Sequence, residues 1–140
     1  MTEHHFYEPR NGHRTVPGLA HDPLNAIVAP RPIGWISTLS AEGVRNLAPY
    51  SFFSLYNYRP PIIGFTSTGW KDSVANVTAT GEFVWNLATR DLAEAMNASA
   101  ATVAADIDEF DLAGLAIAPS RIVAPPRVAA RPAPLQCRHT

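Results

Sequence analysis

The sequence predicts a mainly β fold with flanking helices, and two observations lead to this prediction. Apolar runs of strand length recur between turn signals, at residues 33–39, 44–48, 62–67 and 83–87. Helical periodicity is confined to two short windows, residues 72–81 and 91–101. With 140 residues, the chain is large enough for one domain that buries about two-thirds of the surface of the unfolded chain.

The N-terminal residues 1–21 are predicted to form an irregular arm, because they are rich in His, Arg, Pro and Gly. The predicted domain then spans residues 22–140. Asp22 and Pro23 are typical of an N-cap and a first helical position, so a short helix through Ile27 is expected.

A β-hairpin is predicted next. Residues 33–39 alternate between two partly apolar faces, which suits the wall of a barrel, and residues 40–43 have the composition of a turn into a returning strand at 44–48. The aromatic stretch from Pro49 to Phe53 is predicted to bend, and a turn is expected at 58–61. The crowded aromatics of this region favour core or interface positions over ligand stacking.

A strand, a polar turn and a helix N-terminus follow one another at residues 62–77. Ser67 to Gly69 form the turn, and Lys71-Asp72-Ser73 open a helical pattern in which Val74 and Val77 share a face. Free amide hydrogens and the helix dipole favour an anion at such an end, and Lys71 is the only lysine in the chain. This arrangement predicts a phosphate cradle, weighed against the commoner reading of Lys71 as a solvated charge.

The second half of the chain alternates in character. The first helix is expected to end at Gly81, a strand to occupy 83–87, and a second helix to occupy 91–101 with a capping-box pattern at its start. The acidic residues of 106–111 lack calcium-loop order and are predicted to form a solvated loop. Prolines from residue 119 onward exclude a helix over most of the tail, and a further strand is expected to open at 135–138.

Composition argues against several classes of function. The net charge of −1 and the pI near 6.5 give no basic field for nucleic acid and no polybasic membrane patch. No apolar run approaches membrane-spanning length, and the start of the chain is not a secretory signal. The histidines lack metal-ligand spacing, so no metal is expected. The single Cys137 is expected to be a small buried residue. A cytoplasmic protein is the default expectation.

Two segments together resemble the flavin reductase-like family of FMN-binding split barrels. They are Arg-Pro-Ile-Gly-Trp-Ile-Ser-Thr at 31–38 and Asn-Leu-Ala-Pro-Tyr-Ser-Phe-Phe at 46–53. The resemblance continues in the same order through Lys71-Asp72-Ser73 and Glu82 to Leu87, and it covers roughly residues 22–138. It implies a six-stranded antiparallel split barrel with flanking helices, and a homodimer with FMN at or near the subunit interface.

The resemblance also implies which residues bind the cofactor, namely Arg31, Ser37, Thr38, Ser51, Phe52, Phe53, Ser67, Lys71, Asp72, Ser73 and Asn76. By this analogy Arg31, Ser37 and Thr38 would lie near the flavin and its phosphate tail. Residues 51–53 would line the isoalloxazine. Ser67 and residues 71–73 would hold the phosphate, with Asn76 beside the ribityl chain or the phosphate.

The activity implied by the resemblance is hydride transfer from NADH or NADPH to flavin, which is FMN or, as the alternative, FAD. Oxygen, free flavin or a partner oxygenase would then accept the electrons. This chemistry needs no side chain as a general acid, so no catalytic residue is named. Two alternatives stay open, a non-catalytic FMN-binding electron carrier and an inactive fragment. Members of the family continue for several strands beyond the position of Cys137, so the barrel is expected to be incomplete at the C-terminus. A pyridoxamine-phosphate oxidase-type split barrel is less well matched by residues 31–38.

Overall fold

The computed structural model describes residues 4–12, 14, 16–130 and 132–140, and the chain divides into two compact units between Arg31 and Pro32. In the N-terminal unit, a 3-10 helix η1 (Pro9–Asn11) precedes α1 (Pro23–Ile27). The Asp22 carboxylate accepts hydrogen bonds from the amides of Leu24 and Asn25, so the predicted helix is confirmed. Within the predicted arm, residues 1–3, 13 and 15 lie outside the described residues.

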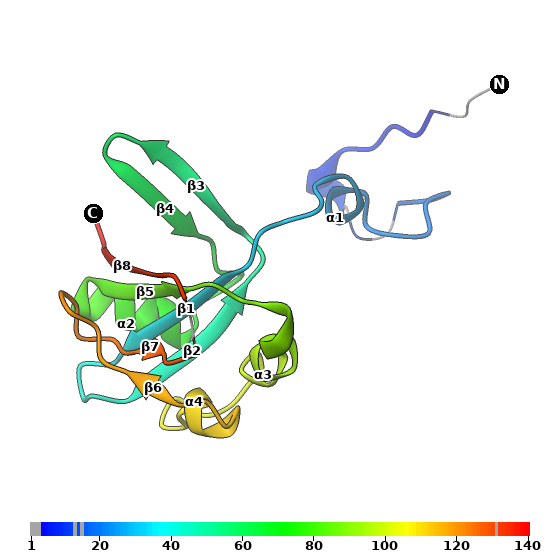
Figure 1. The fold of residues 1–140 in the computed structure, drawn as a ribbon. Helices are drawn as coiled ribbons and strands as arrows, with labels where there is room; N and C mark the ends of the chain where they lie inside the picture. The colour runs from blue at the N-terminus through cyan, green and yellow to red at the C-terminus, as the bar shows by residue number, and fades with distance from the viewer. Residues whose placement is uncertain (1–3, 13, 15, 131) are drawn as a thin grey trace. The chain divides into compact units, whose positions relative to one another are not determined.

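The second unit is built on an antiparallel sheet of four strands in the order β2-β1-β5-β8. These strands are β1 (Gly34–Leu39), β2 (Arg45–Tyr50), β5 (Glu82–Asn86) and β8 (Pro134–Arg138). A hairpin of β3 (Phe53–Tyr58) and β4 (Pro61–Phe65) projects beyond the sheet, and β6 (Ile117–Ala118) pairs with β7 (Arg127–Val128) (Figure 1). The described strands form three separate sheets that do not close into a barrel.

Strand β1 separates two cores because successive side chains of a strand point to opposite faces. On one face Trp35 packs with Leu47, Phe110 and Val128. On the other face Ile36 packs with residues of β2, α2 and β5, namely Tyr50, Val77 and Phe83. The 3-10 helix η2 (Arg90–Leu92), α3 (Ala93–Ala98), α4 (Glu109–Leu112) and β7 supply the first face, and α2 (Asp72–Thr80) with β4 supplies the second.

Most of the predicted elements are present. Helix α2 begins at Asp72 and ends at Thr80, and Gly81 follows as the C-cap in the left-handed conformation, with a φ of +74°. The predicted strands at 83–87 and 135–138 correspond to β5 and β8, and the helix predicted at 91–101 is divided into η2 and α3.

Strand β3 was not predicted from the sequence. Five of its six residues are exposed, and Tyr56 and Tyr58 expose 63% and 81% of their surface. Aromatic residues on both faces of the strand hide the inside–outside alternation that normally identifies a strand. The projecting hairpin is held by pairing with β4 and by the contact of Phe53 at its base.

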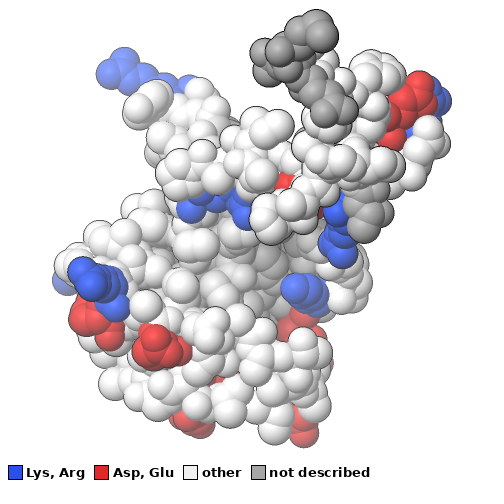
Figure 2. Space-filling model, turned by 90° about the vertical axis from the view of Figure 1, so that its right-hand side faces the viewer, with Lys and Arg blue, Asp and Glu red and all other residues white. Residues whose placement is uncertain are grey.

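One face of the molecule is drawn with its charged side chains coloured in Figure 2. On the face shown in Figure 2, charged side chains form small groups of both signs on a largely uncharged surface, in keeping with the net charge of −1. Among the helices of the described residues, none has the length and apolarity needed to cross a membrane.

Candidate functional site

A pocket of about 390 Å³ lies at the N-terminus of α2. Its walls come from the end of β2, from residues 70–73, from the loop at 99–103 and from Glu109. Three of the predicted phosphate-binding residues, Lys71, Asp72 and Ser73, border this pocket. The structure therefore brings three of the predicted residues to one cavity, while Ser67 is not among the residues that line it.

The helix end beside this pocket lacks a side-chain cap. Lys71 is the N-cap residue, and its side chain makes no capping hydrogen bond with the described residues. Its carbonyl accepts the amide of Ala75, while the first-turn amides of 72–74 have no intrahelical partner. The Lys71 ammonium lies 5.9 Å from the ring centroid of Tyr50, so the positive charge is held above an aromatic face at the pocket.

A buried polar network lies behind the helix end. The Ser73 hydroxyl donates to the side-chain oxygen of Asn46 at 2.7 Å, and the Thr38 hydroxyl donates to the same oxygen at 3.2 Å. The Asn76 amide donates to the Thr38 hydroxyl at 3.0 Å. The predicted cofactor residues Thr38, Ser73 and Asn76 are therefore close together. Their polar groups are hydrogen-bonded to one another or to Asn46, and these bonds link β1, β2 and α2.

The network extends to a buried carboxylate from α4. Glu109 accepts from the side-chain amide of Asn46 and from the backbone amide of Leu47, both at 3.0 Å. Since β2 is an edge strand, this carboxylate satisfies a backbone donor that no neighbouring strand reaches. Burial is the main cause that raises the pKa of Glu109, and these hydrogen bonds oppose the rise.

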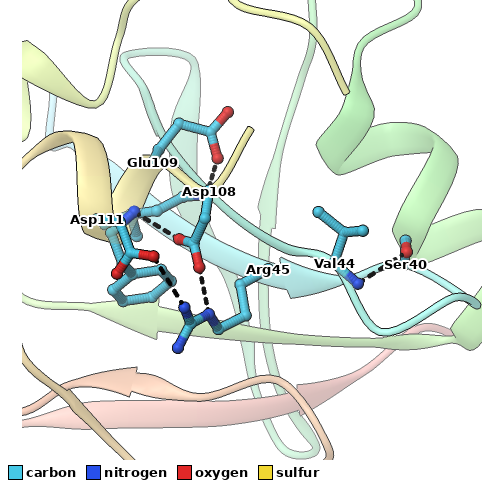
Figure 3. A network of polar contacts seen from close by, with 8 residues as sticks. Ser40, Val44, Arg45, Asp108, Glu109 and Asp111 are labelled. Atoms are coloured by element: carbon cyan, nitrogen blue, oxygen red, sulfur yellow. Dashed lines mark hydrogen bonds and ion pairs between the residues drawn. The ribbon is translucent and has the colours of Figure 1, made fainter. Parts of the chain in front are cut away.

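The prediction that residues 106–111 form a solvated loop is wrong for Glu109, which is 4% exposed. Neighbouring acids fix its helix. The Asp108 carboxylate accepts the amide of Phe110, and Figure 3 shows the Arg45 guanidinium pointing toward Asp108 and Asp111, with which it forms ion pairs. The positive partner lies more than sixty positions away in sequence, so local composition suggested a solvated loop.

The Tyr50 hydroxyl is the polar atom at this site with the least satisfied environment. It is buried and makes no hydrogen bond of regular geometry with the residues that the structure describes. Burial raises the pKa of Tyr50, while the nearby hydroxyls of Ser73 and Ser67 lower it slightly. The phenol is therefore held in its protonated, hydrogen-bond-donating form.

The predicted isoalloxazine residues follow Tyr50 directly along the chain. Phe53 stacks on Trp85 with ring centroids 5.8 Å apart and planes 3° apart. A Cβ at Gly34 would lie 2.7 Å from the Phe53 ring, so only glycine permits this close approach. Phe52 exposes 46% of its surface, and its carbonyl accepts the amide of Thr66.

Two predicted residues are not among those that line the pocket. Ser37 lies on the opposite face of the sheet from Thr38, where it donates to the carbonyl of Pro126 at 2.6 Å and accepts from Asn86. Arg31 belongs to the N-terminal unit, and its guanidinium donates to the carbonyl oxygens of Val28 and Asn25. Their assignment as flavin contacts stays a prediction.

Sequence reasoning missed three residues of this site, namely Tyr50, Asn46 and Glu109. Tyr50 and Asn46 stand in the segment 46–53, where strand alternation places them on the face of Thr38 through the register Thr38↔Asn46. The predicted hairpin of residues 33–48 is enough to place Asn46 opposite Thr38 and Tyr50 on the same face. No local pattern identifies Glu109.

Comparison with known proteins relates this chain to one protein family. The family model described as "Flavin reductase like domain" matches residues 28–140. A protein of Deinococcus radiodurans with no assigned function is 44% identical over 124 residues, which are 82% of this chain and 55% of that protein. The chain spans about half the length of the curated relatives it matches, from 51% to 60%.

Solved structures agree with this result. Nitrilotriacetate monooxygenase component B from Bacillus cereus is 26% identical, with a TM-score of 0.78 over 94% of this chain and 63% of that chain. A protein with a split barrel domain from Shewanella frigidimarina also has a TM-score of 0.78, over 94% of this chain and 63% of that one. Its 19% identity shows the fold alone. The predicted fold class, an unclosed split barrel with flanking helices, is confirmed.

Proposed function

The chain belongs to the flavin reductase-like family, and we propose that it binds the phosphate of a flavin nucleotide in the pocket at the N-terminus of α2. The observation that supports this most is the position of Lys71. The only lysine of the chain stands at the N-terminus of α2, on the rim of the pocket. Among the described residues, this helix end has no side-chain cap, and its first-turn amides have no partner within the helix. Such an end combines a cation, free donors and a favourable dipole for an anion.

The hydrogen-bond donors and the cation at this helix end suit a phosphate monoester, whereas two carboxylates at the pocket oppose its binding. Lys71 and the amides of 72–74 supply charge and hydrogen bonds, and charge-assisted hydrogen bonds are the stronger kind. Asp72 and Glu109 also line the pocket and repel an anion. The Glu109 charge is partly offset because its carboxylate accepts two hydrogen bonds, so Lys71 has to balance chiefly Asp72.

The aromatic segment after Tyr50 would orient the flavin ring. Phe53 is fixed by Gly34 on one side and Trp85 on the other, which makes it a rigid apolar surface beside the backbone of Ser51 and Phe52. An apolar slot with a few donors at its edge is the usual setting for a cofactor ring. Bound flavin would supply the redox chemistry, accepting a hydride from NADH or NADPH. The protein contributes position and electrostatics, and no side chain is assigned as an acid or base.

The assembly and the acceptor are part of the same proposal. A homodimer with flavin at the subunit interface would cover the exposed aromatics of β3, and a partner oxygenase would receive reduced flavin. The name of the Bacillus cereus structure, a monooxygenase component, supports an oxygenase partner. FMN is favoured, with FAD as the alternative.

The test is an absorbance spectrum of the purified chain before and after addition of FMN, read together with its mass in solution. A perturbed flavin band on a dimer is the expected result. Oxidation of NADH or NADPH by the FMN-loaded protein would identify an oxidoreductase, and binding without oxidation would identify an electron carrier. A flavin spectrum identical to that of free FMN at all protein concentrations would contradict the proposal.

A further inference from the structure

One buried polar group at the candidate site is left unexplained by packing. Tyr50 is 6% exposed, its hydroxyl is buried, and its ring borders the pocket at the N-terminus of α2. Its hydroxyl has no hydrogen-bond partner of regular geometry among the described residues, although most buried polar side-chain atoms in proteins have one. A phenylalanine would fill the same space without that loss.

The serine hydroxyls beside the Tyr50 hydroxyl, those of Ser67 and Ser73, donate their hydrogen bonds to other acceptors. Ser67 donates to the carbonyl of Gly69 at 2.8 Å, and Ser73 donates to the side-chain oxygen of Asn46 at 2.7 Å. Of these three hydroxyls, only that of Tyr50 has no hydrogen-bond acceptor of regular geometry among the described residues. Lys71 lies over the Tyr50 ring, so a cation and a free O–H donor are held by adjacent side chains at one helix end.

We propose that Tyr50 is a further ligand-binding residue, whose hydroxyl donates a hydrogen bond to a phosphate oxygen of the flavin nucleotide. This inference rests on the proposed function and adds a residue to its site. Because burial raises the pKa of Tyr50, the phenol stays protonated at neutral pH and keeps a proton that it can donate to an anion. A metal ion is disfavoured at the same place, because the Lys71 ammonium already occupies the face of the ring.

The experiment compares FMN with riboflavin, which has the same ring and no phosphate, in titrations followed by flavin fluorescence. The Tyr50→Phe variant is expected to bind FMN about tenfold more weakly and riboflavin as well as the parent does, since a hydrogen bond to a charged group is worth at least about that factor. Tyr7→Phe is the matched control, because Tyr7 belongs to the N-terminal unit and is not among the residues that line this pocket. It is expected to leave both affinities unchanged.

Stability separates a ligand contact from a structural hydrogen bond. Without flavin, Tyr50→Phe is expected to be as stable as the parent or more stable, because the substitution removes an unsatisfied buried hydroxyl. A marked loss of stability, or an unchanged FMN affinity while Lys71→Ala weakens binding, would overturn the role of Tyr50 and leave the proposed function standing. A parent protein that binds no FMN would contradict the proposed function itself, so the two failures are distinguishable.

Discussion

The two faces of the central sheet differ, although one strand supplies both. Ser37 and Thr38 are neighbours on β1, both are completely buried, and both hydroxyls are hydrogen-bonded. The Ser37 face is closed by α3, α4 and the β6–β7 pair, whereas the Thr38 face leads through Asn46 and Ser73 to the pocket at the N-terminus of α2. Adjacent residues therefore belong to regions with different tasks.

The closed face satisfies its polar groups internally. Asn86 donates to the carbonyl of Trp35 and accepts the amide of Val128, and the Trp35 indole donates to the Ser99 hydroxyl at 3.0 Å. On the other face, the Tyr50 hydroxyl has no hydrogen-bond partner within the described part of the chain, and the first-turn amides of α2 have no side-chain cap there. We infer that the first face stabilises the domain and that the second binds the ligand.

The largest effect is expected from the closed core. Trp35 is completely buried, so Trp35→Ala should lower the free energy of unfolding by about 3–5 kcal/mol through the cavity it leaves. Trp70→Ala is the matched control, since Trp70 is 74% exposed at the rim of the pocket and its loss should change stability by less than about 0.5 kcal/mol. Urea denaturation measures both, and equal losses would remove the distinction between the faces.

Lys71→Ala tests the ligand-binding face. Loss of its charge-assisted contact is expected to weaken FMN binding by about 1.5–3 kcal/mol, with little change in stability. Arg90→Ala removes another exposed cation, from η2 and outside the pocket, and should leave the affinity as it was. Calorimetric titration with FMN compares the two, and similar affinities in both variants would exclude Lys71 as the phosphate anchor.

The neighbouring hydroxyls of β1 provide a smaller, paired test. Ser37→Ala leaves the buried carbonyl of Pro126 without its donor and should cost about 1–2 kcal/mol of stability while FMN affinity holds. Thr38→Val should cost a similar amount and also weaken FMN binding, because Thr38 fixes Asn46 and Asn76 behind the α2 end. Thermal unfolding and FMN titration of both variants are the measurements. A Ser37 variant with impaired FMN affinity would bring the Ser37 face into the binding site.

The smallest effect concerns the pH dependence at Glu109. Its pKa is raised above the ordinary 4.5, mainly by burial, so the folded state holds this proton more tightly than the unfolded state. The stability from this group is complete below about pH 4.5 and is lost as the pH rises through the raised value. The unfolding free energy of the parent relative to Glu109→Gln should therefore fall with rising pH, with Glu42→Gln as an exposed control. A difference that rises with pH would contradict the assigned sign.

Local sequence patterns were sufficient for much of this fold. The N-cap at Asp22, the glycine stop at Gly81 and the strand alternation of 83–87 are set by neighbouring residues, and each was predicted. Strand β3 was missed because its aromatics are exposed on both faces. The role of Glu109 was missed because its partners, Asn46 and Leu47, are brought near only by the tertiary fold.

The candidate site could be predicted only in part for the same reason. The turn that contains Lys71 is continuous in sequence between one strand, β4, and one helix, α2. Its position beside the pocket could therefore be predicted from local patterns. The separation of Ser37 from Thr38 follows from alternation along β1, which the resemblance to a family did not convey. The Tyr50 hydroxyl could not be identified from the sequence, because the acceptors to which Ser67 and Ser73 donate are brought near them only by folding.

Phosphorus-31 NMR of FMN, titrated with the protein and with its Lys71→Ala variant, tests directly whether the phosphate binds at the N-terminus of α2. The phosphate signal is expected to shift and broaden on binding to the parent, and this change is expected to be largely lost in the variant. A flavin that binds, by its absorbance, while its phosphate signal stays at the free position would contradict the placement of the phosphate at the N-terminus of α2.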